Sequence, residues 1–315
     1  MTAQNTLDKD VASRYLVAEH FQMVSSVKIF EFSKLTTPAA QMLIRHQGDL
    51  DLSGLQELGP ATARILASHI YPLNLSGLNR ISPATAEALA NHKNILNLNG
   101  LKQLSEKTAK ILAKHNHDIF LSGLNTLTTK TAQELAKTKG DLLLRGLSTM
   151  SEDVAEALSK HKGILYLGGF KKMALPVAQK LAKHHGGMGL RGLEELPPDV
   201  AQALAKLKFG LHLGGLKTIS LDSAKAIATH SQGLHLGGLT SVSDEVAVAL
   251  AGHQADLHLG GITHLSPVAL KALVAHKGRL FLGGLANQPQ SVLDQFDKHD
   301  GEVILYPVPD REYGF

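Results

Sequence analysis

The sequence repeats itself every 23 residues, and this period constrains the fold more than any other feature. The stretch Leu73–Leu78 reads Leu-Asn-Leu-Ser-Gly-Leu and is followed by an alanine-rich run that ends at His92. A fixed period of this length indicates stacked units that each bury an apolar face against their neighbours, so the chain is predicted to be a solenoid. The frames open at Leu50, Leu73, Leu96, Ile119, Leu142, Leu165, Met188, Leu211, Leu234, Leu257, Leu280 and Val303, with an irregular earlier copy at Phe30.

Within each repeat the apolar residues change period. Leu73 and Leu75 alternate with Asn74, which predicts a short half-buried strand. Ala86, Leu89 and their neighbours then follow the spacing of one helix face. A hydroxyl residue stands where the helix should begin, and its side chain can accept an unpaired amide N–H. These predicted caps are Ser82, Ser105, Thr128, Ser151, Ser220, Ser243 and Ser266.

One column of the repeat is occupied by glycine. Glycine at the same place in successive repeats indicates a backbone requirement, either a positive φ or close packing at a turn. The column comprises Gly54, Gly77, Gly100, Gly123, Gly146, Gly169, Gly192, Gly215, Gly238, Gly261 and Gly284.

The chain is predicted to have three parts. Residues 1–29 precede the repeats, and a helical stripe from about residue 8 to residue 23 is expected to cap the array. Residues 30–306 form the array itself. Residues 307–315 are expected to be a C-terminal cap, because their prolines and charges would keep the last strand from pairing with another chain.

Composition excludes several functions. The net charge of +4 is spread along the chain, which gives no case for nucleic-acid binding. The absence of cysteine removes disulfides and cysteine-based chemistry, and no apolar run is long enough for membrane insertion. No hydrolase, metalloprotease or phosphate-loop motif is present, so we expect no enzyme activity and no cofactor. We expect a monomer that is cytoplasmic, or exported by a route without a Sec signal peptide.

Ten of the 17 histidines share one column near the end of the predicted helices. One interpretation is an array that binds metal or senses pH. The favoured one is structural, with ring N–H groups that meet unpaired carbonyls at helix ends, because adjacent helices about 10 Å apart are too distant for their imidazoles to share a metal. The column is His46, His69, His92, His115, His161, His184, His230, His253, His276 and His299.

A second, shorter histidine column lies on the predicted strands. His212, His235 and His258 occupy the middle of Leu-x-Leu, which points away from the core. Strands about 4.8 Å apart would stack the three rings, and glycines flank them on the same face. Such a stack could hold a small ligand or a divalent metal ion, which we keep as an alternative.

The residue type at the middle of the strand changes along the chain, as expected where a function depends on positions that the repeat does not fix. The aromatic side chains at this position and the neighbouring arginines are residue types that carry much of the binding energy at protein interfaces. The other interpretation is that these residues vary by random sequence change on a surface that binds nothing. The predicted partner-binding residues are Phe120, Leu143, Arg145, Tyr166, Arg191, His212, His235, His258 and Phe281, and no residue is predicted to be catalytic.

The frame Leu-x-Leu-x-Gly-Leu-x-x-Leu-Ser resembles the leucine-rich repeats, over about 275 of the 315 residues. Where the usual asparagine ladder would fall, the chain has Leu78, Leu101 and their equivalents after glycine, which is similar to a bacterial 23-residue variety. The resemblance implies an α/β, horseshoe-like solenoid with parallel strands on the concave face and short helices on the convex face. It also implies non-catalytic binding of another protein. A host-directed, effector-like module is a further alternative.

Overall fold

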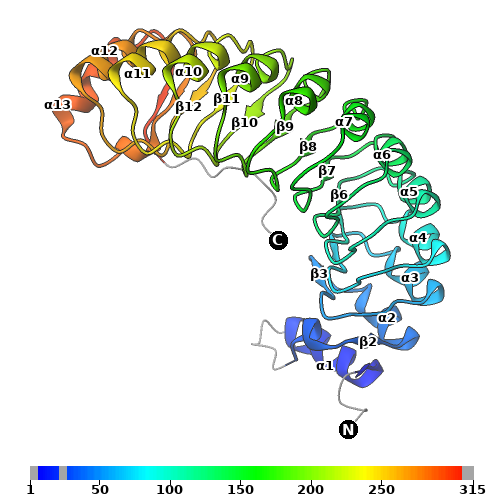
Figure 1. Ribbon diagram of the computed structural model, residues 1–315. Helices are drawn as coiled ribbons and strands as arrows, with labels where there is room; N and C mark the ends of the chain where they lie inside the picture. The colour runs from blue at the N-terminus through cyan, green and yellow to red at the C-terminus, as the bar shows by residue number, and fades with distance from the viewer. Residues whose placement is uncertain (1–5, 21–26, 307–315) are drawn as a thin grey trace. The chain divides into compact units, whose positions relative to one another are not determined.

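A computed structural model describes residues 6–20 and 27–306. The chain divides into two compact units, residues 1–166 and residues 167–315, and each is described by itself. In both units short strands and short helices alternate along the chain (Figure 1). The prediction of an α/β solenoid is therefore confirmed. The division into a cap, an array and a second cap stays a prediction, and the expected C-terminal cap lies outside the described residues.

The first unit begins with a small layer that covers its end. Strand β1 (Thr6–Leu7) pairs in parallel with β2 (Lys34–Leu35). Helix α1 (Lys9–His20) packs against α2 (Thr37–Leu43). The frame at Phe30 forms a short 3-10 helix, η1 (Ile29–Glu31), in place of a strand. Since β1 and β2 form a separate pair, the long sheet has β3 as its first strand.

The rest of the first unit is regular. Each strand pairs in parallel with the next, and the partners are one repeat apart, so that Leu73 lies opposite Leu96. The elements are β3 (Leu50–Asp51), α3 (Pro60–Leu66), β4 (Leu73–Asn74), α4 (Pro83–Leu89), β5 (Leu96–Asn97), α5 (Glu106–Leu112), β6 (Ile119–Phe120), α6 (Thr129–Leu135), β7 (Leu142–Leu143), α7 (Glu152–Leu158) and β8 (Leu165–Tyr166).

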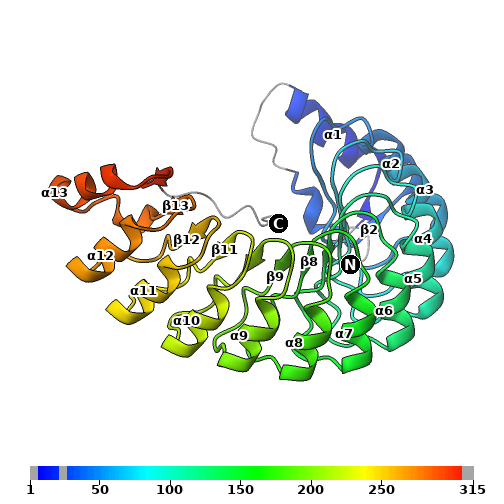
Figure 2. The same cartoon turned by 90° about the horizontal axis from the view of Figure 1, so that it is seen from above.

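The second unit continues the same pattern. Helices α9 to α12 lie side by side along it (Figure 2), and each strand pairs in parallel with the next. Its elements are α8 (Leu175–Leu181), β9 (Met188–Gly189), α9 (Pro198–Leu204), β10 (Leu211–His212), α10 (Leu221–Ile227), β11 (Leu234–His235), α11 (Asp244–Ala251), β12 (Leu257–His258), α12 (Pro267–Val274), β13 (Leu280–Phe281), η2 (Gly283–Leu285), α13 (Gln290–Leu293), η3 (Asp294–Lys298) and β14 (Val303–Ile304).

The core of each repeat lies between its strand and its helix. Leu75, Ala86 and Leu89 are fully buried, as the two periodicities predict. All seven predicted hydroxyl caps accept a backbone N–H at the start of their helix. Burial of these apolar side chains holds the strand and helix of one repeat together.

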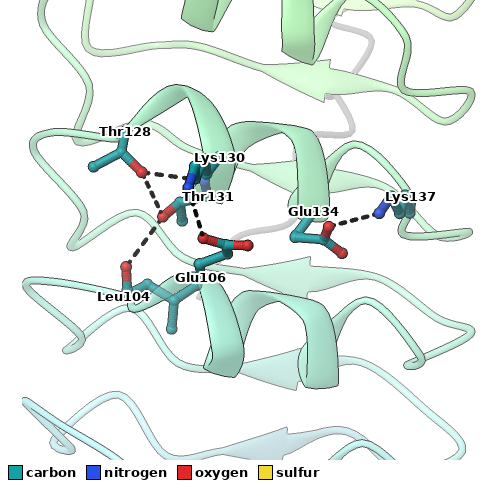
Figure 3. A network of polar contacts seen from close by, with 7 residues as sticks. All are labelled: Leu104, Glu106, Thr128, Lys130, Thr131, Glu134 and Lys137. Carbon is teal, nitrogen blue, oxygen red and sulfur yellow. Dashed lines mark hydrogen bonds and ion pairs between the residues drawn. The ribbon is translucent and has the colours of Figure 1, made fainter.

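The helix starts also join neighbouring repeats. Thr128 caps α6, and Thr131 in the first turn donates its hydroxyl to Leu104 O of the preceding repeat at 3.4 Å (Figure 3). The same contact is made by Thr85 to Leu58 O and by Ser223 to Leu196 O. Buried hydroxyl groups of this column therefore satisfy carbonyls that a helix-entry loop would leave unpaired.

The glycine column is explained by close packing. A Cβ added to Gly77 would lie 2.1 Å from Ser53 O and 2.5 Å from Leu55 O. The corresponding glycines in both units meet carbonyl oxygens of the preceding repeat at similar distances. Among the described residues only Gly48 is a glycine with a positive φ, so the turn requires the absence of a side chain and not a left-handed backbone.

Candidate functional site

The strand face is the surface formed by the middle residue of each strand and the residues two positions before and after it. In the second unit its centre is a row of four half-buried rings on β10 to β13. The ring centroids of His212 and His235 are 3.8 Å apart, and those of His235 and His258 are 3.6 Å apart. The ring of Phe281 continues the stack at 3.6 Å from His258, with only 8° between the planes. The predicted histidine stack is confirmed.

The rings of this row are uncharged at neutral pH. Burial lowers the pKa of His212 to about 4 and that of His235 to about 2, and the positive charge of Arg191 lowers both further. Burial also lowers the pKa of His258 to about 4, although Asp256 acts in the opposite direction. Adjacent imidazolium rings at these separations would repel each other, so the stack is an apolar ridge with polar edges.

Glycines border the ridge on both sides. A Cβ added to Gly237 or to Gly260 would have no atom within 4 Å, and one added to Gly210 would meet only Gly233 O at 3.7 Å. These glycines are not required by the backbone, unlike those of the turn column. They leave open space beside the rings, where another chain can approach the sheet closely.

The last strands of the row carry an ion pair. The Nε–H of Arg279 is shared between Oδ1 and Oδ2 of Asp256, with both N–O distances 3.1 Å, and Nη2 of Arg279 also contacts Oδ2. The guanidinium carbon of Arg279 lies 5.6 Å from the ring centroid of Phe281. The pair fixes an exposed arginine over the end of the ring stack, because the contact joins two adjacent strands.

The strand face of the first unit differs from the expectation. Phe120, Leu143 and Tyr166 are 1%, 1% and 5% exposed, and they form a buried cluster with Ile95 and Ile164. The middle of the strand is expected to point away from the core, whereas these three side chains pack against one another and are buried. Their contact with a partner stays a prediction.

Arginines lie next to this column in both units. Arg145 is half-buried and its guanidinium carbon lies 5.9 Å from the ring centroid of Tyr166. Arg191 is half-buried in the second unit, where its charge acts on the histidine row. Both occupy the position two residues after the middle of the strand, as the sequence predicts.

A set of polar contacts on β3 to β5 is not among the expectations from the sequence. Asn74 donates its side-chain N–H to Asp51 at 3.0 Å. Asp51, Asn74 and Asn97 each accept the backbone N–H two residues further on, which closes a small turn after the strand. The available signal was the run of Asp and Asn in one column, since these side chains bond readily to a nearby backbone N–H.

The longer histidine column lies inside the molecule. The nine members from His69 to His299 are at most 8% exposed. Stacked neighbours in the column, such as His92 and His115, have ring centroids 6.2 to 6.4 Å apart. His276 Nδ1 lies 3.2 Å from Ala251 O and His276 Nε2 lies 3.0 Å from Ala255 O. The carbonyl at Ala251 belongs to the preceding helix, so the column links repeats at helix ends. This supports the structural interpretation, in which the ring nitrogens meet carbonyls at helix ends.

The geometry of both histidine columns disfavours a shared metal ion. Among the described residues, no group of three or more His, Asp or Glu side chains is arranged to hold one. In the row on the strand face, nearly parallel rings direct their lone pairs in parallel, whereas ligands of one metal must converge on it. In the buried column both ring nitrogens of His69, His276 and His299 face backbone carbonyls instead.

A hollow of about 1240 Å³ lies in the first unit, among the loops before helices α2 to α4. Its lining includes Lys34 and Glu57, whose charged groups are 3.5 Å apart. The remaining lining is mainly hydroxyl, amide and aliphatic, with no residue pair arranged as nucleophile and base. In the part of the chain that the structure describes, no helix is long and apolar enough to cross a membrane.

No protein-family model matches the sequence, and no curated protein matches it. One similar solved structure is a chain of the glycosylated Toll–Spätzle complex from Drosophila, with 14% identity and a TM-score of 0.46. The match covers 85% of this chain and 41% of that chain, so this chain spans less than half of its length.

The class of protein follows from the repeat itself. A leucine-rich frame of 23 residues, one parallel strand per repeat and one helix after most strands define a leucine-rich-repeat-like protein. Proteins with this architecture typically bind other proteins, and the fold alone fixes no partner.

Proposed function

We propose that this chain is a non-catalytic interaction module that binds another protein through the strand face. The observation that carries the proposal is the ridge of half-buried rings from His212 to Phe281, with open glycine positions beside it. A rigid sheet with an apolar ridge and polar ring edges can contact a partner at small entropic cost. Nothing in the repeat frame requires histidine at these positions, since Asn, Phe and Leu occupy them elsewhere.

The proposed binding residues are those predicted from the sequence, with a changed emphasis. In the second unit Arg191, the three stacked histidines and Phe281 are half-buried and reachable. In the first unit Arg145 is reachable, whereas Phe120, Leu143 and Tyr166 would support the surface from below. We therefore place the main contact on β9 to β13.

The test compares two tryptophan variants of the same repeat. Gly237→Trp fills the open space beside the ring row, whereas Val248→Trp places the same bulk on the exposed side of α11. Proteins retained from the native lysate by the wild type are identified, and the strongest is purified. Its affinity for each variant is then measured by calorimetry.

We expect Gly237→Trp to weaken that affinity at least tenfold and Val248→Trp to leave it within twofold. Both variants should keep the wild-type unfolding midpoint, since both positions have room for a larger side chain. If Val248→Trp loses the partner and Gly237→Trp keeps it, the helix side is the binding surface and the proposal is wrong.

A second candidate function is binding of a small ligand or a divalent metal ion by His212, His235 and His258. The planar stacking of the rings argues against one ion shared by all three. Zinc titration separates the candidates, because a protein partner should bind equally well with and without zinc at equal concentration. A host-directed module would bind through the same surface. It can be distinguished from the proposed interaction module only by whether the partner is a host protein.

We further infer that the protein acts as a monomer, in the cytoplasm or after export without a Sec signal. We also infer that the repeats are of the bacterial 23-residue type without an asparagine ladder. The ladder column holds the buried Leu78 and Leu101, which leaves no place for asparagine side chains there. Gly77 and Gly100 directly precede these two leucines, and at both glycines the turn packs tightly against the preceding repeat.

A further inference from the structure

Hollows lie between the ends of consecutive helices in the first unit. The hollow between α3 and α4 has a volume of about 490 Å³, and the one between α4 and α5 has a volume of about 460 Å³. The hollow between α6 and α7 is larger, at about 690 Å³. We call it the lysine hollow, because Lys137, Lys139, Lys160 and Lys162 line it.

The larger volume coincides with a break in the buried histidine column. His69 lines the hollow between α3 and α4, and His92 lines the one between α4 and α5. The corresponding residue of the lysine hollow is Thr138, which is 3% exposed and donates its hydroxyl to Leu135 O at 2.9 Å. Threonine has no ring, so less of the space between these two helix ends is filled.

The charges of the lysine hollow depart from the pattern of the rest of the chain. Elsewhere, residues at the same position of adjacent repeats often carry opposite charges and form ion pairs. Such pairs are Lys34 with Glu57, Lys171 with Glu194, Lys172 with Glu195 and Arg279 with Asp256. In the lysine hollow the residues one repeat apart are Lys137 and Lys160, and likewise Lys139 and Lys162. Like charges therefore stand next to each other here.

The backbone keeps these like charges together. Gly140 and Gly163 directly follow Lys139 and Lys162, and a Cβ added to Gly163 would lie 2.8 Å from Gly140 O. The two loops are thus in contact, and the backbones that carry the two lysines cannot separate without loss of this packing. Like charges on directly adjacent backbone segments are destabilising, so the arrangement costs stability in the absence of an anion.

Other groups in the lining compensate only part of this positive charge. Lys137 forms an ion pair with Glu134 at 2.6 Å (Figure 3). In the described part of the chain no carboxylate forms an ion pair with Lys139, Lys160 or Lys162. The ends of α6 and α7 each add about half a negative charge, which explains a preference for lysine there but leaves the lining positive.

We propose that the lysine hollow is a binding site for a ligand that carries at least two phosphate groups. A phosphate group carries about −1.5 to −2 charges at pH 7, so one group can lie between the two lysines of each repeat. Lysine binds phosphate as a point charge and needs no fixed planar geometry. The volume of the hollow falls within the range of about 300 to 1,000 Å³ that is usual for small-molecule sites, whereas a single phosphate would occupy only a small part of it.

This site is independent of the proposed function. It lies at the helix ends of the first unit, whereas the proposed protein contact is on β9 to β13. Its ligand is a small anion in place of a protein, so either proposal can fail without the other.

The test measures binding of sodium tripolyphosphate to the full chain by calorimetry, at about 0.15 M salt so that weak surface attraction is screened. The first variant combines Lys139→Gln with Lys162→Gln. The control combines Lys107→Gln with Lys110→Gln, which removes the same charge from exposed positions of α5. A third variant, Thr138→His, keeps every lysine and restores the ring that fills this position in neighbouring repeats.

We expect the wild type to bind one tripolyphosphate. The lysine-hollow variant should weaken the affinity at least tenfold, and the control should stay within twofold of the wild type. Thr138→His should weaken the affinity at least threefold, because the hollow becomes smaller at unchanged charge. All three variants should keep the wild-type unfolding midpoint, since the lysines are exposed and the repeat accepts histidine at this position.

The source of the phosphate groups is distinguished by a second arm. Vesicles of phosphatidylcholine that contain phosphatidylinositol bisphosphate are sedimented with the wild type and with the lysine-hollow variant. Retention of the wild type alone assigns the phosphates to a lipid headgroup, whereas tripolyphosphate binding without retention assigns them to a soluble ligand. Failure of tripolyphosphate to bind, equal weakening by the two double variants, or an unchanged affinity of Thr138→His would overturn the proposal.

Discussion

At the scale of single residues, two adjacent glycines serve different purposes. A Cβ at Gly238 would lie 2.1 Å from Gly214 O and 2.7 Å from Leu216 O, both in backbone of the preceding repeat. A Cβ at Gly237 would meet nothing within 4 Å. Close packing of one repeat on the next therefore depends on Gly238, whereas Gly237 only leaves the strand face open.

This difference predicts opposite tolerance to alanine. Gly238→Ala should lower the free energy of unfolding by about 3 kcal/mol or more, because two carbonyl groups must shift to make room. Gly237→Ala should change it by less than about 0.5 kcal/mol, as for an open surface position. Urea unfolding of both variants followed by circular dichroism checks the pair. Similar losses in the two proteins would contradict the packing account.

At the scale of elements, the two histidine columns make the stacked strands and helices sensitive to acid. Burial lowers the pKa of His235 to about 2 and that of His92 to about 4, and it also lowers the pKa of His276. In the unfolded chain these groups titrate near the ordinary histidine pKa of about 6.5. As the pH falls below that value, the unfolded chain takes up protons that the folded chain does not, so stability is lost.

The free energy of unfolding should therefore be constant above about pH 7 and fall steadily between about pH 6.5 and pH 4. His235 alone should account for about 2 kcal/mol between pH 7 and pH 5, and His235→Phe should lessen the fall by that amount. Phenylalanine keeps the stack, as Phe281 already does beside His258. The exposed His264 is the matched control, and His264→Phe should leave the fall at its wild-type size. Equal falls in all three proteins would contradict the account.

The elements were largely predictable from sequence, and the exposure of the strand face was not. The alternation of Leu73 and Leu75 and the Ser82 cap depend on contacts within one repeat, which periodicity reports directly. Burial of Phe120 depends on the size of the side chains next to it in the neighbouring repeats, such as Ile95 and Leu143. The acceptors of His276 are likewise in the preceding repeat. The same residue type at one position of successive repeats indicates that its surroundings are alike in each repeat. It does not indicate which neighbouring repeat provides the contacting atoms.

At the scale of the whole molecule, the 23-residue repeat is an interchangeable unit. Strand partners are one repeat apart along both units, and the turn glycines and helix-start hydroxyls contact the preceding repeat. Stability in such an array is close to a sum over repeats and their interfaces. The strand face follows from this arrangement, because only correctly stacked strands bring the middle residues into one row.

Deletion of one whole repeat tests this claim most directly. Removing residues 142–164 joins two identical frames and should leave a folded chain with unchanged helical signal per residue and one cooperative urea transition. Removing residues 142–153 deletes β7 and joins Asp141 to Val154 in the first turn of α7, and it should abolish the transition, since the next strand arrives out of register. Both proteins are measured by circular dichroism in the same urea series. A cooperative transition in the first protein only is the predicted result, and equal damage in both would contradict the solenoid account.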